Sequence, residues 1–394
     1  MRAALLISPR ASVIEDARKA GYNYIFVFIK ETLQAENTEK LADEVFLFNW
    51  NDYRKALYYA KIINKICPLH RIYGFGEYSV KLAAYLTEAL GIKGVTLGSV
   101  ERATNKSLMR RLLNQEEKHR VLFETVSSYQ ELKQAIERIS FPVIVKPIDG
   151  AGSSNVFKLS NLQDLNMISR QFDLDTSFIC EEYIEGKEIS VEAISFNGLH
   201  KIIAITEKQT TGNPRFIESG HILPYYPDKA IYQQIEESVH FTLDILPLKT
   251  GISHTEMIIT LEGPKIVETH VRPGGDKITD LVRLATGTSL FFALFYYDLN
   301  EVSVYPDTIE YECTASSQFL FFQPGKVKSI VGENQLKQHP NVIEFQLNVE
   351  QGDVLQTPED SGSRHGSIII KGRNKSKVED IISEIKSLLR IEYE

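Results

Sequence analysis

Residues 141–155 read FPVIVKPIDGAGSSN and join a short apolar run to a loop of glycine and serine. The run predicts a β-strand over Phe141–Pro147, and a further strand is expected over Val156–Leu159. The loop between them lacks the Gly-Lys-Ser/Thr ending of a Walker P-loop and the GxGxxG spacing of a dinucleotide fold. Its glycines and serines can still offer N–H groups and hydroxyls to a phosphate, and Lys146 adds a positive charge beside them. Taken alone, the loop would more simply be an ordinary β-turn.

The first hundred residues alternate between two periodicities. Short apolar runs predict strands over Ala3–Ser8, Tyr24–Lys30, Glu44–Phe48 and Arg71–Gly74, and helical spacing predicts helices over Ala11–Ala20, Asp52–Ile66 and Tyr78–Leu90. This alternation predicts a parallel sheet with helices on both faces, and such sheets bind ligands beyond the C-terminal ends of their strands. Glu77 follows the fourth strand at such an end. It either contacts a ligand there or stabilises the first turn of the next helix.

The middle of the chain predicts further helices and two hairpins. We expect helices from about Ala103, carrying Lys106, and over Tyr129–Ile139, Ile231–Leu243 and Thr279–Ala285; a strand over Phe178–Ile184; and hairpins formed by Glu188–Asn197 with Leu199–Thr206 and by His254–Thr260 with Lys265–Val271. The strand over Phe178–Ile184 ends in an acidic, extended stretch. Such a stretch can offer a carbonyl and an amide to an adenine edge, and a carboxylate a few residues later can bind ribose hydroxyls. Without the phosphate loop, the stretch would be only an acidic strand end.

The second hairpin brings two carboxylates together. If its loop spans Thr260–Pro264, Glu256 lies directly opposite Glu268 with Cβ atoms about 5 Å apart. Carboxylates at that distance repel each other, and a hard divalent cation such as Mg²⁺ relieves the repulsion. Arg272 follows His270 on the same face and can clamp a carboxylate or a phosphate through two N–H groups. The alternative is a surface hairpin that carries a solvated ladder of charges.

In this order and spacing, the elements resemble the ATP-grasp superfamily of carboxylate–amine ligases over about residues 1–300. Within it they are most similar to the L-amino acid ligases of the bacilysin-synthetase type, which make dipeptides, because residues 218–224 (ESGHILP) and His254-Thr255-Glu256 match segments of those enzymes. The resemblance implies an α/β (α+β) fold, in which an ATP-grasp fold follows a Rossmann-like parallel-sheet domain and precedes a small C-terminal α/β domain. The implied boundaries are 1–100 for the Rossmann-like domain, 101–185 for the ATP-grasp lid, 186–300 for the catalytic subdomain and 301–394 for the C-terminal subdomain.

The resemblance also implies the chemistry. An ATP-dependent ligase of this kind joins the carboxylate of one L-amino acid to the amine of another through an acyl-phosphate and releases ADP and phosphate. The implied cofactors are ATP and Mg²⁺, with Mn²⁺ as an alternative metal. The implied residues are Lys106, Lys146, Gly152, Ser153, Ser154, Glu181, Glu182, Ile184 and Glu188 for ATP; Glu256, Glu268 and His270 for the metal; and Glu77, Glu218, His221, Arg272, Gly275 and Asp276 for the substrates. Among them, Lys146 and Arg272 would offset charge during catalysis, and Glu218 and His221 are alternative bases for the amine.

Two positions depart from the family pattern. His270 stands where many ATP-grasp enzymes have Asn as a third metal ligand, and a neutral imidazole is a softer ligand for Mg²⁺, so His270 is either a ligand or an orienting group. Asp276 stands where the bacilysin-type enzyme is expected to have a bulky aromatic residue. It either widens the donor pocket for a larger, cationic amino acid such as arginine, or caps the following helix.

Composition excludes several other classes of protein. The 44 Lys+Arg and 52 Asp+Glu residues give a net charge of −8, so a non-specific nucleic-acid binder is not expected, and any anion must be held by a local cluster of cations. The three cysteines form no CxxC pair, which indicates neither a zinc knuckle nor a disulfide framework and fits a reducing cytoplasm. The longest apolar run, Leu290–Tyr297, is far shorter than the ~20 residues that span a bilayer.

Some alternatives stay open at this stage. The chain could be a carbamoyl, biotin-carboxylase-like or purine-pathway ATP-grasp ligase, although no biotinyl-carrier segment is seen. It could also be a nucleotide-binding regulatory protein without turnover. The last ninety residues read as mixed α/β with a closing helix over Lys377–Leu389, and they either cap the active site or pair two copies of the chain in a homodimer.

Overall fold

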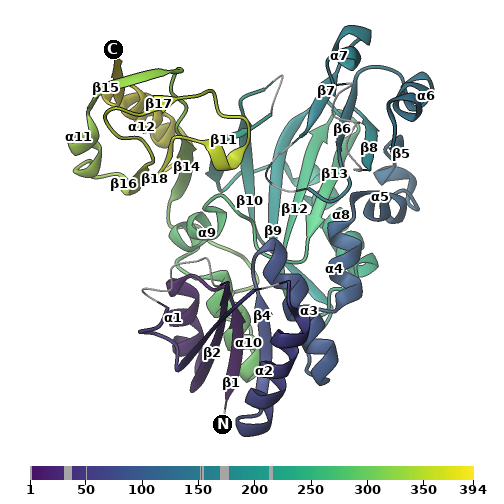
Figure 1. The fold of residues 1–394 in the computed structure, drawn as a ribbon, viewed down its shortest axis with the longest axis vertical. Coiled ribbons are helices and arrows are strands. Elements are labelled where there is room, and N and C mark those ends of the chain that lie inside the picture. The colour runs from purple at the N-terminus through teal and green to yellow at the C-terminus, as the bar shows by residue number, and fades with distance from the viewer. Residues whose placement is uncertain are drawn as a thin grey trace.

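The computed structural model describes residues 2–30, 38–49, 51–150, 152, 155–168, 177–212 and 216–394. Figure 1 shows three lobes around a long central sheet, with the N-terminal sheet at the bottom, the C-terminal segments at the upper left and a smaller lobe at the upper right. The fold is mixed α/β, as predicted.

The N-terminal lobe is the predicted parallel sheet. Its spatial order is β3 (Glu44–Phe48), β2 (Tyr24–Lys30), β1 (Ala3–Ile7) and β4 (Leu69–Gly74), and it is accompanied by α1 (Ala11–Ala20), α2 (Tyr53–Ile66) and α3 (Glu77–Leu90). Every residue of β1 is buried, as expected for a strand covered on both faces. Helices α2 and α3 pack on one face, and α1 packs on the other.

The second helix on the α1 face comes from much later in the chain. Helix α10 (Leu290–Asn300) reads LFFALFYYDLN and packs beside α1, with Leu294 and Phe295 buried in the shared core. A helix that is apolar almost all round is typical of one enclosed by neighbours. The sequence analysis noted this apolar run but predicted no helix for it. In the described residues no single helix could cross a membrane by length and composition; α9 (Ile278–Thr286) and α10 pass that test only as a pair bent by 75°.

The lid lobe is a four-stranded antiparallel sheet. Its order is β5 (Phe123–Val126), β8 (Phe178–Glu182), β6 (Val143–Pro147) and β7 (Phe157–Leu159), packed against α6 (Tyr129–Ile139) and α7 (Leu162–Met167). A strand does follow the glycine/serine loop, as predicted, whereas β5 was not predicted. The helix expected from about Ala103 is present as α5 (Lys106–Leu113), which begins three residues later, and the preceding helix α4 (Leu97–Thr104) was not predicted. The Asn105 side chain accepts a hydrogen bond from the Leu108 N–H and caps α5, which separates the two helices.

The long sheet has eight antiparallel strands. Its order is β13 (Gly263–His270), β12 (Gly251–Thr260), β9 (Lys187–Phe196), β10 (Leu199–Thr210), β11 (Glu218–Leu223), β14 (Thr314–Phe319), β18 (Gly366–Gly372) and β16 (Val342–Leu347). Both predicted hairpins are present, and α8 (Lys229–Ile245) packs beside β10 and β13. Strand β11 was not predicted. Strand β10 continues to Thr210, four residues beyond its expected end, and this extension carries a site residue.

The C-terminal segments extend the long sheet and add a small one. Strands β17 (Val354–Leu355), β15 (Gly325–Val331) and β19 (Arg390–Tyr393) form a three-stranded sheet, with α11 (Glu333–Lys337), α12 (Lys375–Leu388) and the short turn Ser361–Ser363 beside it. Helix α12 confirms the predicted closing helix and packs its apolar face on β18. The turn Ser361–Ser363 reaches the lid, because the Ser361 N–H lies 3.4 Å from the Gly152 carbonyl.

Candidate active site

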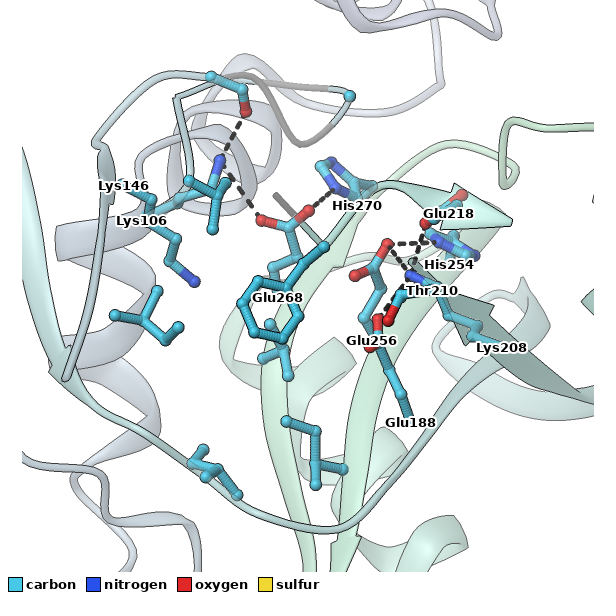
Figure 2. Close-up of a pocket in the computed structure, with 18 of the residues that line it drawn as sticks. Lys106, Lys146, Glu188, Lys208, Thr210, Glu218, His254, Glu256, Glu268 and His270 are labelled. Carbon is cyan, nitrogen blue, oxygen red and sulfur yellow. Dashed lines mark hydrogen bonds and ion pairs between the residues drawn. The ribbon is translucent and has the colours of Figure 1, made fainter. Parts of the chain in front are cut away.

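A cleft of about 580 Å³ lies between the lid sheet and the long sheet. Figure 2 shows charged side chains entering it from both sides. Most of the predicted residues line the cleft: Lys106, Lys146, Gly152, Glu181, Glu182, Ile184, Glu188, Glu218, Glu256, Glu268, His270, Arg272, Gly275 and Asp276. Glu77 and His221 contact lining residues from behind. Ser153 and Ser154 lie outside the described residues.

A buried ion cluster forms the lid side of the cleft. The Glu181 carboxylate receives the Lys146 ammonium at 2.9 Å and the Arg110 Nε at 2.7 Å. Burial alone would raise the pKa of Glu181, but Arg110 and Lys146 outweigh burial and lower the pKa to about 2. Arg110 also donates to the Ile266 and Val267 carbonyls and so ties the lid to β13. The cluster holds Lys146 at the cleft wall.

Lys106 approaches from the first turn of α5. Its ammonium donates to the Gly150 carbonyl at 2.6 Å and lies 3.3 Å from a Glu268 oxygen. It therefore joins the glycine loop to the carboxylate pair. With Lys146, it gives the phosphate end of the cleft two buried ammonium groups.

The two predicted carboxylates face each other. Glu256 pairs with Glu268 across β12 and β13, as predicted, but the turn is tighter than the expected Thr260–Pro264 loop. Thr260 pairs with Gly263, and a register shift between Glu256 and Met257 brings the two glutamates opposite each other. Burial would raise the pKa of Glu256, but Lys208 and His254 lower it to about 2; burial likewise opposes the effect of Lys106 on Glu268, whose pKa is well below its ordinary value. Both groups are therefore ionised oxygen ligands at neutral pH.

This pair fits a magnesium ion that arrives with phosphates. Among the described residues, no group of three or more His, Cys, Asp or Glu side chains is arranged to hold a metal by itself. Mg²⁺ usually takes one or two carboxylates and fills its remaining positions with water and substrate phosphates. His270 contacts the Glu268 carboxylate through Nε2 at 3.0 Å, which suits an orienting group.

Lys208 is the main site residue that sequence analysis missed. Its side chain is 1% exposed, and its ammonium lies 2.7 Å from Glu218, 2.9 Å from Glu256 and 3.1 Å from Glu188. Burial would lower the pKa of Lys208, but the three carboxylates raise it well above its ordinary value. Because β10 was expected to end at Thr206, Lys208 was left outside the strand. Continued alternation along the strand would have placed it on the same face as Thr206.

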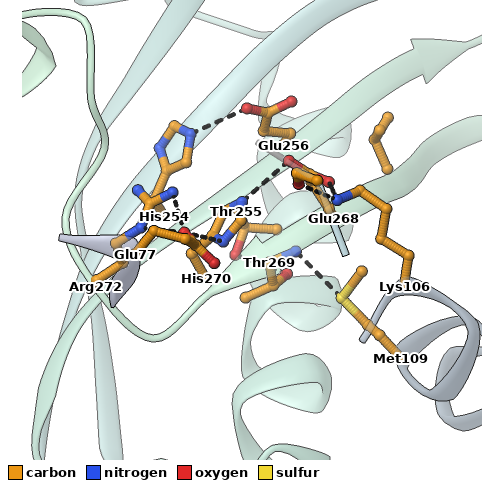
Figure 3. Close-up of polar contacts among 12 residues, drawn as sticks. Glu77, Lys106, Met109, His254, Thr255, Glu256, Glu268, Thr269, His270 and Arg272 are labelled. Carbon is orange, nitrogen blue, oxygen red and sulfur yellow. Dashed lines mark hydrogen bonds and ion pairs between the residues drawn. The ribbon is translucent and has the colours of Figure 1, made fainter. Parts of the chain in front are cut away.

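A second histidine supports the metal pair from behind. His254 Nδ1 lies 2.6 Å from the fully buried Glu192 carboxylate, and Nε2 lies 3.2 Å from Glu256 (Figure 3). Burial would lower the pKa of His254, but Glu192 and Glu256 raise it to about 10, so the ring is an imidazolium at neutral pH. Gly274 packs against this pair, since a Cβ atom there would lie 2.8 Å from His254 Nδ1.

Arg272 is held by the N-terminal domain. Its Nε and Nη2 atoms lie 2.7 and 2.6 Å from a Glu77 oxygen, and His270 Nδ1 lies 3.6 Å from the same oxygen (Figure 3). Glu77 begins α3, directly after the C-terminal end of β4, which is where the sequence placed it. The N-terminal sheet thus orients the guanidinium at the rim of the cleft.

The far end of the cleft is formed by Glu218, Asp276 and a C-terminal arginine. His221 is fully buried behind Glu218, with Nε2 3.3 Å from that carboxylate and Nδ1 3.2 Å from the Ser317 hydroxyl. Both oxygens of Asp276 receive Arg364, a residue of the C-terminal segments that was not among the predicted site residues. The capping alternative for Asp276 is wrong, because α9 has Lys277 at its N-cap and no side chain caps it.

Comparison with known proteins places this geometry in context. Residues 139–280 match the ATP-grasp domain family, and residues 318–394 match L-amino acid ligase C-terminal domain 2. The chain is 29% identical over 279 residues to D-alanine–D-alanine ligase B of Clostridium perfringens, covering 66% of this chain and 88% of that protein. It is 24% identical over 339 residues to an L-arginine-specific L-amino acid ligase of Bacillus subtilis, covering 82% and 80%. The crystal structure of an L-amino acid ligase from Bacillus licheniformis superposes with a TM-score of 0.86 at 20% identity, covering 100% of this chain and 99% of that one.

Proposed function

We propose that this chain, which belongs to the ATP-grasp superfamily of ATP-dependent carboxylate–amine ligases, joins two L-amino acids into a dipeptide. The carboxylate of one amino acid would accept the γ-phosphoryl group of ATP, and the amine of the other would displace phosphate from the resulting acyl-phosphate. The proposal is based on one observation: Lys106, Lys146, Glu256, Glu268 and Glu218 all line the same cleft.

The charges in the cleft match what phosphoryl transfer needs. A carboxylate is a poor electrophile toward an amine, and phosphorylation gives it a good leaving group. Such a transfer depends on positioning and on neutralising phosphate charge more than on covalent help. Lys106, Lys146 and Arg272 would supply that positive charge, each held in place by a carboxylate. A magnesium ion held by Glu256 and Glu268 would polarise the phosphate oxygens.

The nucleotide base would bind where the lid meets the long sheet. After β8 ends at Glu182, the backbone runs on to Gly186 without regular structure and lines the cleft. Among the described residues, no backbone hydrogen bond from the Ile184 N–H is present, so this group can bind an adenine edge, with the Glu182 carbonyl beside it. Glu188 lies further along the cleft wall, in reach of a ribose.

The amine substrate would bind at Glu218. Glu218 lines the cleft, whereas His221 is fully buried behind it, so we infer that Glu218 contacts the incoming amino group and His221 positions Glu218. Arg272, Gly275 and Asp276 close this end of the cleft and would face the amino-acid donor. A basic donor such as arginine is supported by the arginine-specific relative, although the Asp276 carboxylate at this end of the cleft is paired with Arg364.

The surroundings of the enzyme follow from the same argument. We infer that Mn²⁺ can replace Mg²⁺, because two carboxylates and phosphate oxygens suit both ions. Cytoplasmic action is supported by the spacing of the three cysteines. Capping of the site by the C-terminal segments is supported by Ser361, which lines the cleft, and by Arg364. A homodimer remains a prediction, to be checked by light scattering.

The decisive experiment is phosphate release measured over all pairs of the twenty amino acids, with mass analysis of the products. We expect ADP and phosphate to appear only with specific amino-acid pairs, together with a product whose mass is that of the two acids minus water. Phosphate release that depends on bicarbonate instead would favour a carbamoyl or biotin-carboxylase-like ligase. Nucleotide binding without phosphate release for any pair would favour a regulatory protein.

A further inference from the structure

Lys208 connects three parts of the cleft that have different proposed ligands. The carboxylates around its ammonium come from the start of β9 (Glu188, ribose), the start of β11 (Glu218, amino acid) and the middle of β12 (Glu256, metal). Figure 2 shows the three acids converging on this one side chain. A buried ammonium donates at most three hydrogen bonds, so these contacts use its full capacity.

Glu256 and Glu268, the pair proposed to bind the metal, consequently have their charges neutralised by cations of the protein itself. Glu256 contacts Lys208 and His254, and Glu268 contacts Lys106 and His270. Each carboxylate therefore already has a lysine ammonium within 3.3 Å. A free divalent ion would have to give up hydration water, which Mg²⁺ does reluctantly, and would then lie next to buried positive charges.

We propose that the Lys208 ammonium holds the cation position among Glu188, Glu218 and Glu256, so that the enzyme excludes free divalent metal and takes it only together with a nucleotide. The phosphates of the nucleotide offset the added positive charge, and its ribose claims Glu188. Lys208 then keeps Glu218, at the amino-acid end of the cleft. Lys208 thereby couples the nucleotide site to the amino-acid site. This inference rests on the proposed function for the roles of Glu188, Glu218, Glu256 and Glu268.

The test is a Mn²⁺ titration without nucleotide or amino acid, followed by electron paramagnetic resonance of the free ion. Lys208→Met should bind Mn²⁺ at least about ten-fold more tightly than the wild-type protein, because three carboxylates lose their counter-ion. Lys208→Arg, which keeps the charge, should bind as weakly as the wild type. Lys375→Met is the matched control: it removes another lysine–glutamate pair, 2.8 Å from Glu207, in which Lys375 is 43% exposed. Equal Mn²⁺ affinity of Lys208→Met and the wild type, or tight binding by Lys208→Arg, would overturn the proposal.

Thermal unfolding supplies an independent reading. In EDTA, Lys208→Met should melt below the wild type, and MgCl₂ should raise its melting temperature while leaving that of the wild type unchanged. If Lys208→Met does not fold, the wild-type protein alone decides: it should bind Mn²⁺ only when a non-hydrolysable ATP analogue is present, and binding without the analogue would refute the proposal. No turnover is measured, so failure here is distinct from failure of dipeptide synthesis.

Discussion

Arg364→Met tests whether Asp276 selects the amino-acid donor. Arg364 donates through Nη1 to Asp276 at 3.0 Å and through Nε to the Ser361 carbonyl at 2.7 Å, and its guanidinium carbon lies 3.6 Å from the centre of the Phe319 ring. The Arg364 side chain is 9% exposed and that of Asp276 is 24% exposed. The Arg364 guanidinium is therefore already paired with the Asp276 carboxylate, which a cationic donor side chain would need as its partner.

The magnitude follows from this intermediate burial. Removing one partner of a fully buried pair costs roughly 3–5 kcal/mol and of an exposed pair about 0.5 kcal/mol, so we expect Arg364→Met to lose about 2 kcal/mol of stability. The released carboxylate should then favour basic over neutral donors about tenfold, which equals about 1.4 kcal/mol. Burial and the Glu218 carboxylate raise the pKa of Asp276, so the assay should be run at several pH values and the donor ratios compared where they no longer change with pH.

The assay compares kcat/KM for basic and neutral donors by phosphate release, with one acceptor held constant. Lys277→Met is the control, because it removes a neighbouring cation that pairs with the more exposed Glu344 at 2.6 Å. Folding of both variants is checked by circular dichroism. An unchanged ratio in folded Arg364→Met would refute the reasoning and show that Asp276 does not read the donor side chain.

Three further perturbations separate metal, charge and packing. Glu268→Ala should abolish Mg²⁺-dependent ADP release, and near wild-type turnover would remove Glu268 from the metal site. The pKa of Glu181 is lowered from 4.5 to about 2, so its ionised form stabilises the fold by roughly 3 kcal/mol above pH 4.5, and this stabilisation is lost as the pH falls toward 2. The free energy of unfolding of Glu181→Gln, measured with urea, should not show this decrease at acid pH. A decrease like that of the wild type would contradict the assignment. Gly274→Ala should lower the stability by about 1–3 kcal/mol in thermal unfolding, because its Cβ atom would lie 2.8 Å from His254 Nδ1. Gly275→Ala should keep wild-type stability, because a Cβ atom there meets nothing within 4 Å. Equal melting temperatures of the two variants would argue against close packing at Gly274.

Local periodicity was enough to predict the parts of the fold that depend on neighbours in sequence. The common strand parity of Glu256 and Glu268 was readable in the chain, but the exact turn was not: Thr260 pairs with Gly263, and a register shift between Glu256 and Met257 was needed to bring the two glutamates opposite each other. The parallel N-terminal sheet likewise follows from alternating strands and helices. The break before Lys106 was missed, although Asn105 is a typical helix-capping residue and could have signalled it.

Contacts between distant segments were not predictable in the same way. Helix α10 covers the first sheet although more than half of the chain lies between Gly74 and Leu290, and its apolar sequence does not say which surface it meets. Arg110 and Arg364 pair with Glu181 and Asp276 across sequence separations of 71 and 88 residues. In the sequence, each arginine is indistinguishable from an ordinary surface charge, because only the three-dimensional fold brings it next to the carboxylate with which it forms an ion pair.

The net charge of −8 acquires a different meaning once these partners are known. The acids of the cleft are not a repulsive surface, since each of the two facing carboxylates is matched by a lysine, Lys208 for Glu256 and Lys106 for Glu268. A phosphate that enters this cleft meets buried lysines, and the carboxylates paired with these lysines can then bind a metal ion or a ribose instead. The same exchange explains how an acidic protein can bind an anionic nucleotide: the cations are local, and the nucleotide and its metal arrive as a pair of opposite charges that replaces the internal pairs.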